Sequence, residues 1–275
     1  MDNLYVKKSG QSTPLVGIWH AHRMSDQILV GRKAVVTGAS RGIGRAIALE
    51  LAAAGADVGL VARSLPDLEK VADEVRGLGR AAVVAHMDVT DAESVNAAVD
   101  DVRQGLGGLD VMVNNSGILT ASYALDLSLA EWDRVINTNL RGTFICCQAA
   151  GRHLTAQGSG KVINVASHFG VMAASGFSAY CASKAAILHL TRVLALEWAR
   201  HGVQVNAIAP GYVATDLSAD VRADPAMETR VLQRIPARRM ADAGEIGPLA
   251  VLLASNRSDY MTGSVLVADG GQSIQ

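Results

Sequence analysis

A tyrosine and a lysine four residues apart, Tyr180 and Lys184, lie in a segment of small and apolar residues, SAYCASKAAIL. If this segment is helical, the two side chains lie one turn apart on the same face. Such a pair could transfer a proton, because a nearby cation favours the phenolate and lowers a tyrosine pKa from its usual value of about 10. The alternative is a packed tyrosine beside a lysine whose charged end reaches water. Motifs elsewhere in the chain favour the proton donor.

A glycine-rich stretch, TGASRGIG, spans residues 37–44 directly after an apolar run. Glycines at 38, 42 and 44 allow a sharp turn and a close approach of the backbone to a pyrophosphate at the N-terminus of the next helix. The spacing G-x-x-x-G-x-G differs from the generic G-x-G-x-x-G of dinucleotide sites, and an ordinary glycine turn is the alternative. Between a strand and a helix, the stretch favours a dinucleotide site.

The end of the second apolar run, DVGLVA at residues 57–62, indicates which dinucleotide is bound. A site that prefers NAD(H) carries an acid here for the ribose 2′-hydroxyl. This sequence has Ala62 followed by Arg63, and Arg41 lies inside the glycine stretch. Arginine binds phosphate with a rigid fork of donors, so we predict NADP(H) in preference to NAD(H). The alternative is that both arginines are solvated surface residues.

Apolar runs of strand length alternate with segments of helical periodicity and must position these residues. They are KAVVTG, DVGLVA, AAVVAHMDV, LDVMVNN, GKVINVAS, VQVNAIAP and SVLVADGG. These runs barely alternate in polarity, which is typical of parallel strands covered on both faces. The predicted fold class is therefore α/β, with one Rossmann-type, doubly wound domain and a seven-stranded parallel sheet flanked by helices. One long helix is expected around Glu131 to His153.

Composition restricts the remaining possibilities. The 275 residues carry a net charge of −1, which argues against nucleic acid or an acidic membrane as partner. No stretch reaches the roughly eighteen apolar residues of a membrane span. Three cysteines form neither a disulfide framework nor a zinc site, so we predict a cytoplasmic protein without a metal. Residues 1–30 lack periodicity and are expected to be a poorly structured extension before the domain at 31–275.

Taken in order, these motifs resemble those of the short-chain dehydrogenase/reductase family. The resemblance runs from about Gly31 to Gly271 and fits an ordinary-length member that prefers NADP(H). It extends to 3-oxoacyl-carrier-protein reductases and to dehydrogenases of sugar acids and polyols. NNSG at 114–117 departs from the commoner NNAG by one hydroxyl. The motifs that carry the resemblance are TGASRGIG, Asp88-Val89, NNSG, Asn139, Ser167, Tyr180-x-x-x-Lys184 and Pro210-Gly211.

The resemblance implies a catalytic tetrad of Asn139, Ser167, Tyr180 and Lys184. Tyr180 would exchange the proton, Lys184 would lower its pKa and bind the nicotinamide ribose, and Ser167 would hydrogen-bond the substrate oxygen. Asn139 would hold a water that relays protons from Lys184, although an amide paired with the backbone is the alternative. Expected cofactor contacts are Gly38, Ser40, Arg41, Gly42, Ile43, Gly44, Arg63, Asp88, Val89, Asn115, Tyr180, Lys184, Pro210, Gly211, Val213 and Thr215.

The predicted activity is hydride transfer between NADP(H) and a carbonyl or secondary alcohol. The substrate could be a ketone, a polyol, a sugar acid or a 3-oxoacyl thioester, and the partners are this small molecule and three further copies in a homotetramer. A non-enzymatic NADP(H)-binding regulator on the same fold is the alternative, which we would expect to lack Tyr180 or Lys184. Residues 212–240 are expected to form a helical lid, with Arg234, Arg238 and Arg239 as a weak candidate for docking a carrier protein. His168 and Cys181 receive no role.

Overall fold

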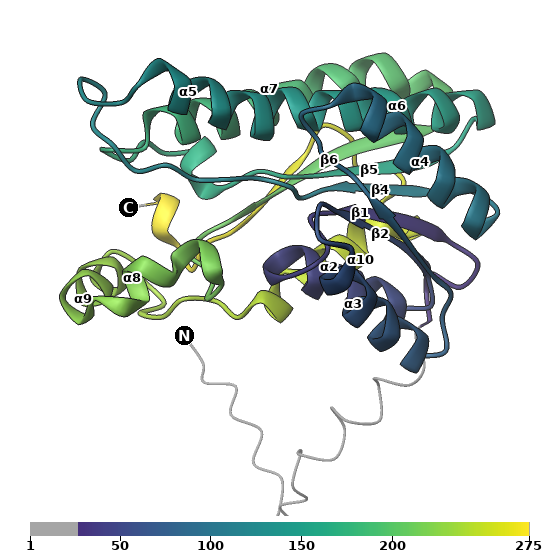
Figure 1. The fold of residues 1–275 in the computed structure, drawn as a ribbon, viewed down its shortest axis with the longest axis horizontal. Helices are drawn as coiled ribbons and strands as arrows, with labels where there is room; N and C mark the ends of the chain where they lie inside the picture. The colour runs from purple at the N-terminus through teal and green to yellow at the C-terminus, as the bar shows by residue number, and fades with distance from the viewer. Residues whose placement is uncertain (1–26, 275) are drawn as a thin grey trace, which may run out of the picture.

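The computed structural model describes residues 27–274, which form one parallel sheet between two layers of helices (Figure 1). The sheet has seven strands in the order β3-β2-β1-β4-β5-β6-β7, and every pairing is parallel. The predicted fold class is confirmed. The strands are β1 Lys33–Thr37, β2 Asp57–Ala62, β3 Ala82–His86, β4 Val111–Asn114, β5 Gly160–Val165, β6 Val203–Pro210 and β7 Val265–Ala268.

Each face of the sheet is covered by its own apolar cluster. Ile47, Leu68 and Leu253 lie in one cluster and come from helices α2, α3 and α10. Val99 and Leu194, from α4 and α7, lie in the other. Figure 1 shows α4, α5, α6 and α7 above the sheet and α2, α3 and α10 below it. These helices are α2 Gly42–Ala53, α3 Leu65–Gly77, α4 Ala92–Leu106, α5 Leu129–Ile136, α6 Gly142–Gln157, α7 Ser178–Trp198 and α10 Gly247–Ala254.

The strand order places a topological switch point between β1 and β4. The chain runs outward from β1 to β2 and β3, and then returns to β4 on the other side of β1. Crossovers leave these two neighbouring strands in opposite directions, which opens a crevice at their carboxyl ends where ligands of doubly wound proteins bind. The glycine stretch follows β1, and NNSG follows β4, so both border this crevice.

The helix expected around Glu131 to His153 is interrupted. The structure has α5, then a π-helical turn at Asn137–Arg141, and then α6. A π-turn widens the backbone locally and is common at functional sites. Here it carries Asn139, whose side chain is fully buried and bonds to the backbone of Ile118. Periodicity did not reveal the interruption, because the five residues of the π-turn, NTNLR, include a single apolar residue and so show no helical period.

The chain after β6 is helical, as expected for residues 212–240. It forms a 3-10 turn at Asp216–Ser218, α8 at Ala219–Ala223 and α9 at Pro225–Gln233. Figure 1 shows α8 and α9 side by side, beyond the edge of the two helical layers. Within the described residues, no helix is both long and apolar enough to cross a bilayer.

The body of the protein begins before Gly31, the start expected from the sequence. Leu29 is fully buried in the cluster of α2 and α3, and its N–H donates to the carbonyl oxygen of Ala54. The predicted extension therefore ends earlier than residue 30. Residues 1–26, on which most of that prediction falls, lie outside the described residues.

Candidate active site

Helix α7 places Tyr180 and Lys184 together beneath the surface. Both side chains are buried, at 7% and 4% exposure, which is unusual for a lysine. The ammonium lies over the phenol ring, 5.6 Å from its centroid. It also donates a hydrogen bond of 2.8 Å to the carbonyl oxygen of Val165, the last residue of β5. Lysine and tyrosine are thus held against the end of a central strand.

The pKa values of Tyr180 and Lys184 are set by burial, which differs from the sequence prediction. Burial raises the pKa of Tyr180 to about 12, and a hydrogen bond with the Ser167 hydroxyl opposes this rise. Burial also lowers the pKa of Lys184 to about 8. The expected lowering of the tyrosine pKa by the ammonium is therefore wrong in this structure, because desolvation dominates at both groups. The phenol is protonated at neutral pH.

Ser167 lies where β5 turns into a short 3-10 helix, and its hydroxyl points to Tyr180. Its Oγ accepts a hydrogen bond of 3.2 Å from the backbone N–H of Phe169, which fixes the side chain at the N-terminus of that turn. The same hydroxyl hydrogen-bonds with the phenol of Tyr180. A carbonyl oxygen that enters here could meet both hydroxyls at once, and the geometry brings the predicted pair together.

Asn139 approaches the lysine from the π-helical turn, but its amide is already engaged. Its Nδ2 donates to the carbonyl oxygen of Ile118 (2.9 Å) and to Oγ of Ser183 (3.1 Å), and its Oδ1 accepts from Ile118 N–H (2.8 Å). A Cβ at Gly117 would lie 3.4 Å from Asn139 Oδ1 and 3.5 Å from Lys184 Nζ, so these atoms border the same small space. The side chain of Asn139 thus pairs with the backbone, which was the alternative to a water-holding role. Only acceptor capacity remains for a water.

A buried polar network that the sequence reading did not single out holds α7 on the sheet. Asn114 Nδ2 donates to Asn164 Oδ1 (2.8 Å), and Asn164 Nδ2 donates to Thr191 Oγ1 (2.9 Å). These residues lie on β4, β5 and α7 and are almost fully buried. Buried amides require partners, so the network fixes how α7 sits on the strands. The signal available in the sequence was an asparagine inside each of two otherwise apolar runs.

The glycine loop after β1 forms a narrow backbone cradle. Gly38 and Gly42 have positive φ angles of 63° and 56°, which favour glycine. A Cβ at Gly44 would lie 2.3 Å from the carbonyl oxygen of Gly38 and 2.4 Å from Nδ2 of Asn115, so no side chain fits there. Asn115 in turn donates from Nδ2 to the carbonyl oxygen of Thr37 (3.0 Å). This predicted cofactor residue therefore braces the loop from β4.

A hollow of about 390 Å³ borders this loop. Its lining includes Arg41 and Gly42 from the glycine loop and Thr215 and Asp216 from the chain after β6. A Cβ at Gly42 would lie only 3.5 Å from the methyl group of Thr215. Two chain segments that both carry predicted cofactor contacts, one after β1 and one after β6, therefore lie next to each other. Backbone cradle, adjoining hollow and basic rim are the features that a phosphate-bearing dinucleotide requires, so the residues present fit NADP(H).

The two arginines predicted to select NADP(H) both lie at the surface, with different neighbours. Arg41 forms an ion pair of 3.3 Å with Asp216, and both side chains are at least 70% exposed. Arg63 is exposed directly after β2 and contributes to the lowered pKa of Asp88, which is due mainly to hydrogen bonds from Thr90. Ala62 leaves the end of β2 without a carboxylate. Arg41 must share its charge between Asp216 and any bound phosphate.

Apart from the residues of α7 and the π-helical turn, the predicted site residues gather at the carboxyl ends of the strands. Each position follows from the parallel sheet, because the C-terminal ends of parallel strands meet at one edge. After β1 come Gly38, Ser40, Arg41, Gly42, Ile43 and Gly44; after β2, Arg63; after β3, Asp88 and Val89; after β4, Asn115; after β5, Ser167; and at or after the end of β6, Pro210, Gly211, Val213 and Thr215.

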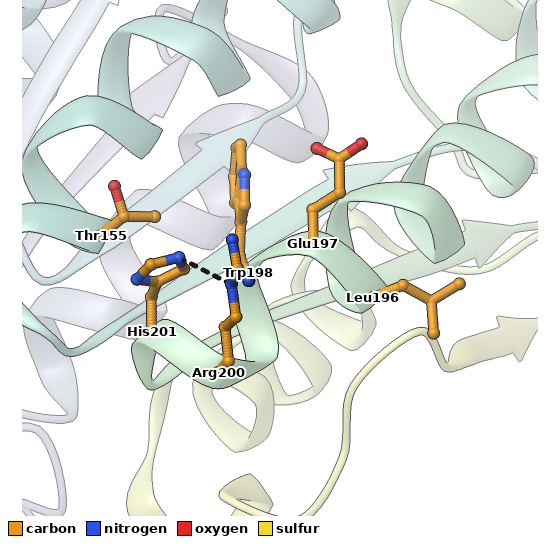
Figure 2. Close-up of a pocket in the computed structure, with 6 residues that line it drawn as sticks. All are labelled: Thr155, Leu196, Glu197, Trp198, Arg200 and His201. Carbon is orange, nitrogen blue, oxygen red and sulfur yellow. Dashed lines mark hydrogen bonds between the residues drawn. The ribbon is translucent and has the colours of Figure 1, made fainter.

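A second hollow, of about 480 Å³, lies at the opposite end of α7 (Figure 2). Figure 2 shows Arg200 hydrogen-bonded to His201, together with the side chains of Trp198 and Glu197 that also line this hollow. None of its lining residues follows the carboxyl end of a strand, and none belongs to the predicted tetrad. Hollow size therefore does not locate the active site, whereas the convergence of buried reactive groups does.

Comparison with known proteins gives consistent matches over almost the whole described chain. The family model described as Enoyl-(Acyl carrier protein) reductase matches residues 38–273. The chain is 39% identical to 2-dehydro-3-deoxy-D-gluconate 5-dehydrogenase of Escherichia coli (strain K12) over 245 residues, 88% of this chain and 96% of that protein. It is 39% identical to the 3-oxoacyl-[acyl-carrier-protein] reductase FabG of Staphylococcus aureus (strain N315) over 241 residues, 87% of this chain and 97% of that protein.

A solved structure extends the likeness to three dimensions. The gluconate 5-dehydrogenase from Burkholderia cenocepacia J2315, crystallised in complex with NADP and tartrate, superposes with a TM-score of 0.87 at 36% identity. The match covers 91% of this chain and 98% of that one. Fold, motif order and length thus agree with one group of oxidoreductases.

Proposed function

The chain belongs to the short-chain dehydrogenase/reductase family, and we propose that it interconverts a ketone and a secondary alcohol with Tyr180 as the proton donor and acceptor. It is an NADP(H)-dependent oxidoreductase, in line with its relatives. The observation that carries the proposal is the buried contact of Tyr180 with Ser167 and Lys184. The relatives do not support the non-enzymatic alternative, and this chain keeps both Tyr180 and Lys184.

In the reducing direction, NADPH held by the glycine loop would supply the hydride for the carbonyl carbon. Tyr180 gives its phenolic proton to the carbonyl oxygen, so hydride and proton together yield the alcohol. Ser167 and Tyr180 both face that oxygen, and their hydroxyls orient it. The raised pKa of Tyr180 keeps the donor protonated at neutral pH. In the oxidising direction, the phenol must first lose its proton, and then the cation of Lys184 stabilises the phenolate.

Proton exchange with solvent requires a route past Lys184. We assign this to Asn139, whose Oδ1 borders the same space as the ammonium. Both amide hydrogens of Asn139 are committed to Ile118 and Ser183, so a relay water would donate to this residue. The amide also holds the loop at Gly117 and Ile118 in place.

For the substrate we propose a small polyhydroxylated acid over a carrier-bound thioester. Two of the three arginines considered for carrier docking are already engaged: Arg239 pairs with both carboxylate oxygens of Glu245, and Arg238 donates to the carbonyl oxygen of Gln233. Arg234 has no ion pair within the described chain. Its positive charge opposes the rise that burial causes in the pKa of Tyr212, the second residue after β6. One free cation suits a single carboxylate. Several relatives act on gluconate or its derivatives by name.

The test is a substrate panel followed through NADPH absorbance. Purified protein is incubated with NADPH and 5-dehydro-D-gluconate, acetoacetyl thioesters or simple cyclic ketones, and with NADP⁺ and the matching alcohols. We expect turnover of the sugar acid at the highest kcat/KM. Preference for the thioester would overturn the substrate proposal, and no turnover of any carbonyl compound would overturn the activity.

We further propose a homotetramer in the cytoplasm. Leu129, Phe144 and Leu196, on α5, α6 and α7, are at least 45% exposed, and an apolar surface on these helices suits contact with another copy. Cys146, Cys147 and Cys181 are all free thiols, which suits a reducing compartment. Light scattering coupled to size-exclusion chromatography would give the mass, and a monomer would contradict the assembly.

A further inference from the structure

His168, the residue after Ser167, is buried with one ring nitrogen fully engaged. Only 3% of the residue is exposed. Its Nδ1 lies 3.1 Å from the carbonyl oxygen of Pro210, which can only accept a hydrogen bond. Nδ1 therefore carries the proton, and in the neutral ring Nε2 is an acceptor. Burial lowers the pKa of His168, so the ring is neutral at pH 7.

The other nitrogen, Nε2, is buried without a hydrogen-bond partner among the residues that the structure describes. An unpaired buried polar atom costs about 1–3 kcal/mol, so such atoms are rare and call for an explanation. The structural role of the ring, which joins the end of β5 to the end of β6, is completed by Nδ1 alone. The fold thus needs an aromatic ring with one donor here, and it gains nothing from Nε2.

The imidazole lies next to the reacting groups, since its Nδ1 is 3.4 Å from Oγ of Ser167. The imidazole packs on Phe169, with 4.1 Å between ring centroids, and lies 5.5 Å from the ring of Tyr212. Phe169 meets the rings of both Tyr180 and Tyr212 edge to face, at 6.5 and 5.9 Å. His168, Tyr180 and Tyr212 therefore surround one phenylalanine. Tyr212 also lies close enough to Arg234, the cation assigned to the substrate carboxylate, for the charge of the arginine to act on the phenol.

We propose that Nε2 of His168 accepts a hydrogen bond from a substrate hydroxyl on a carbon next to the one that is reduced, which makes His168 a specificity residue for α-hydroxy ketones. The proposal rests on the proposed function and adds to it the residue that selects substrates with a hydroxyl next to the reacting carbon. A site built to bind a hydroxyl discriminates strongly against the analogue that lacks it, because its own polar atom is then left unpaired. Only a neutral histidine that is already bonded at Nδ1 presents this acceptor.

The experiment compares three substrates and three proteins. The substrates are 5-dehydro-D-gluconate and its 4-deoxy and 6-deoxy analogues, which lack one or the other neighbouring hydroxyl. The proteins are the wild type, His168→Asn and His168→Gln. The Asn amide lies close to Nδ1 and can keep the bond to Pro210, whereas the Gln amide extends to the position of Nε2. Melting temperature and the NADPH dissociation constant are measured for each protein.

In the wild type we expect kcat/KM for one deoxy analogue to be about tenfold lower than for the parent compound, the range of one hydrogen bond with its unpaired partner. His168→Asn should lower kcat/KM for the parent to the level of that analogue, leave the analogue unchanged and leave NADPH affinity intact. His168→Gln should restore part of the preference. If only one variant folds, the test is its ratio of kcat/KM for the parent compound to kcat/KM for the deoxy analogue, compared with the same ratio in the wild type.

Three results would overturn the inference. Equal wild-type kcat/KM for all three substrates would show that neither neighbouring hydroxyl is bound specifically. A His168→Asn variant that binds NADPH more weakly and slows every substrate equally would assign Nε2 to the cofactor. Failure of the wild type to reduce any of the three would reject the sugar-acid substrate itself, and with it this role for His168, while turnover of other ketones would leave the reductase activity standing.

Discussion

Replacing Lys184 with methionine should stabilise the folded protein while it abolishes turnover. Lys184 is a buried cation whose only hydrogen bond in the described chain is to the carbonyl oxygen of Val165. Burial lowers its pKa from 10.5 to about 8, which means that folding disfavours the charged form. Methionine has a similar length, carries no charge and suits an apolar environment.

The magnitude follows from that pKa. The fall from 10.5 to about 8 corresponds to about 3 kcal/mol, at about 1.4 kcal/mol for each pKa unit. The variant also leaves the carbonyl of Val165 without its donor, which costs about 1–1.5 kcal/mol. The net gain at pH 7 is therefore about 1.5–2 kcal/mol, or a rise of several degrees in melting temperature for a chain of this size.

The gain should depend on pH in a defined direction. Because the pKa of Lys184 is lower in the folded state, the unfolded chain binds the proton first as the pH falls from about 10.5 to about 8. Wild-type stability therefore decreases across that window and is constant below it. At pH 10 the charge penalty shrinks to under about 1 kcal/mol, so the lost bond to Val165 cancels the gain. The pKa of Tyr180, at about 12, contributes only above pH 10.

The assay is urea unfolding of both proteins at pH 7 and pH 10, with NADPH binding measured alongside. Lys161→Met is the matched control, because Lys161 is equally buried but pairs with Asp259 at 2.6 Å. That control should lose stability at pH 7. A Lys184→Met protein that is less stable than wild type at pH 7, or whose difference from wild type is the same at both pH values, would refute the desolvation argument.

Three further predictions use other parts of the site. Tyr180→Phe should reduce kcat at least a thousandfold while NADPH quenching of protein fluorescence gives an unchanged dissociation constant; substantial turnover would remove the phenol from the mechanism. Ala62→Asp combined with Arg63→Gln should reverse the wild-type preference for NADPH over NADH in kcat/KM, expected at tenfold or more from one charge-assisted bond, and equal use of both by the wild type would contradict the arginine argument. Gly44→Ala should raise the NADPH dissociation constant at least tenfold and lower the melting temperature, since its Cβ would lie 2.3 Å from Gly38 O; unchanged binding would show that the loop can widen.

The sequence alone determined the features that depend on neighbours along the chain. Seven apolar runs gave seven strands, because a strand covered on both faces is apolar at most of its positions. The glycine spacing after β1 located the cradle, since positive φ angles at Gly38 and Gly42 are a local requirement. The spacing of four positions from Tyr180 to Lys184 placed both on one face of α7, as helix geometry demands.

Tertiary structure decided the features that depend on burial and on distant partners. The pKa of Tyr180 rises although a cation lies above its ring, because desolvation depends on everything packed around α7. Asn139 lies in a π-turn because its amide pairs with Ile118, 21 residues earlier. β6 brings the carbonyl of Pro210 to Nδ1 of His168, while no described residue offers Nε2 a partner. Local spacing shows which groups can meet, whereas their charge and free hydrogen-bonding capacity depend on how the rest of the chain excludes water from them.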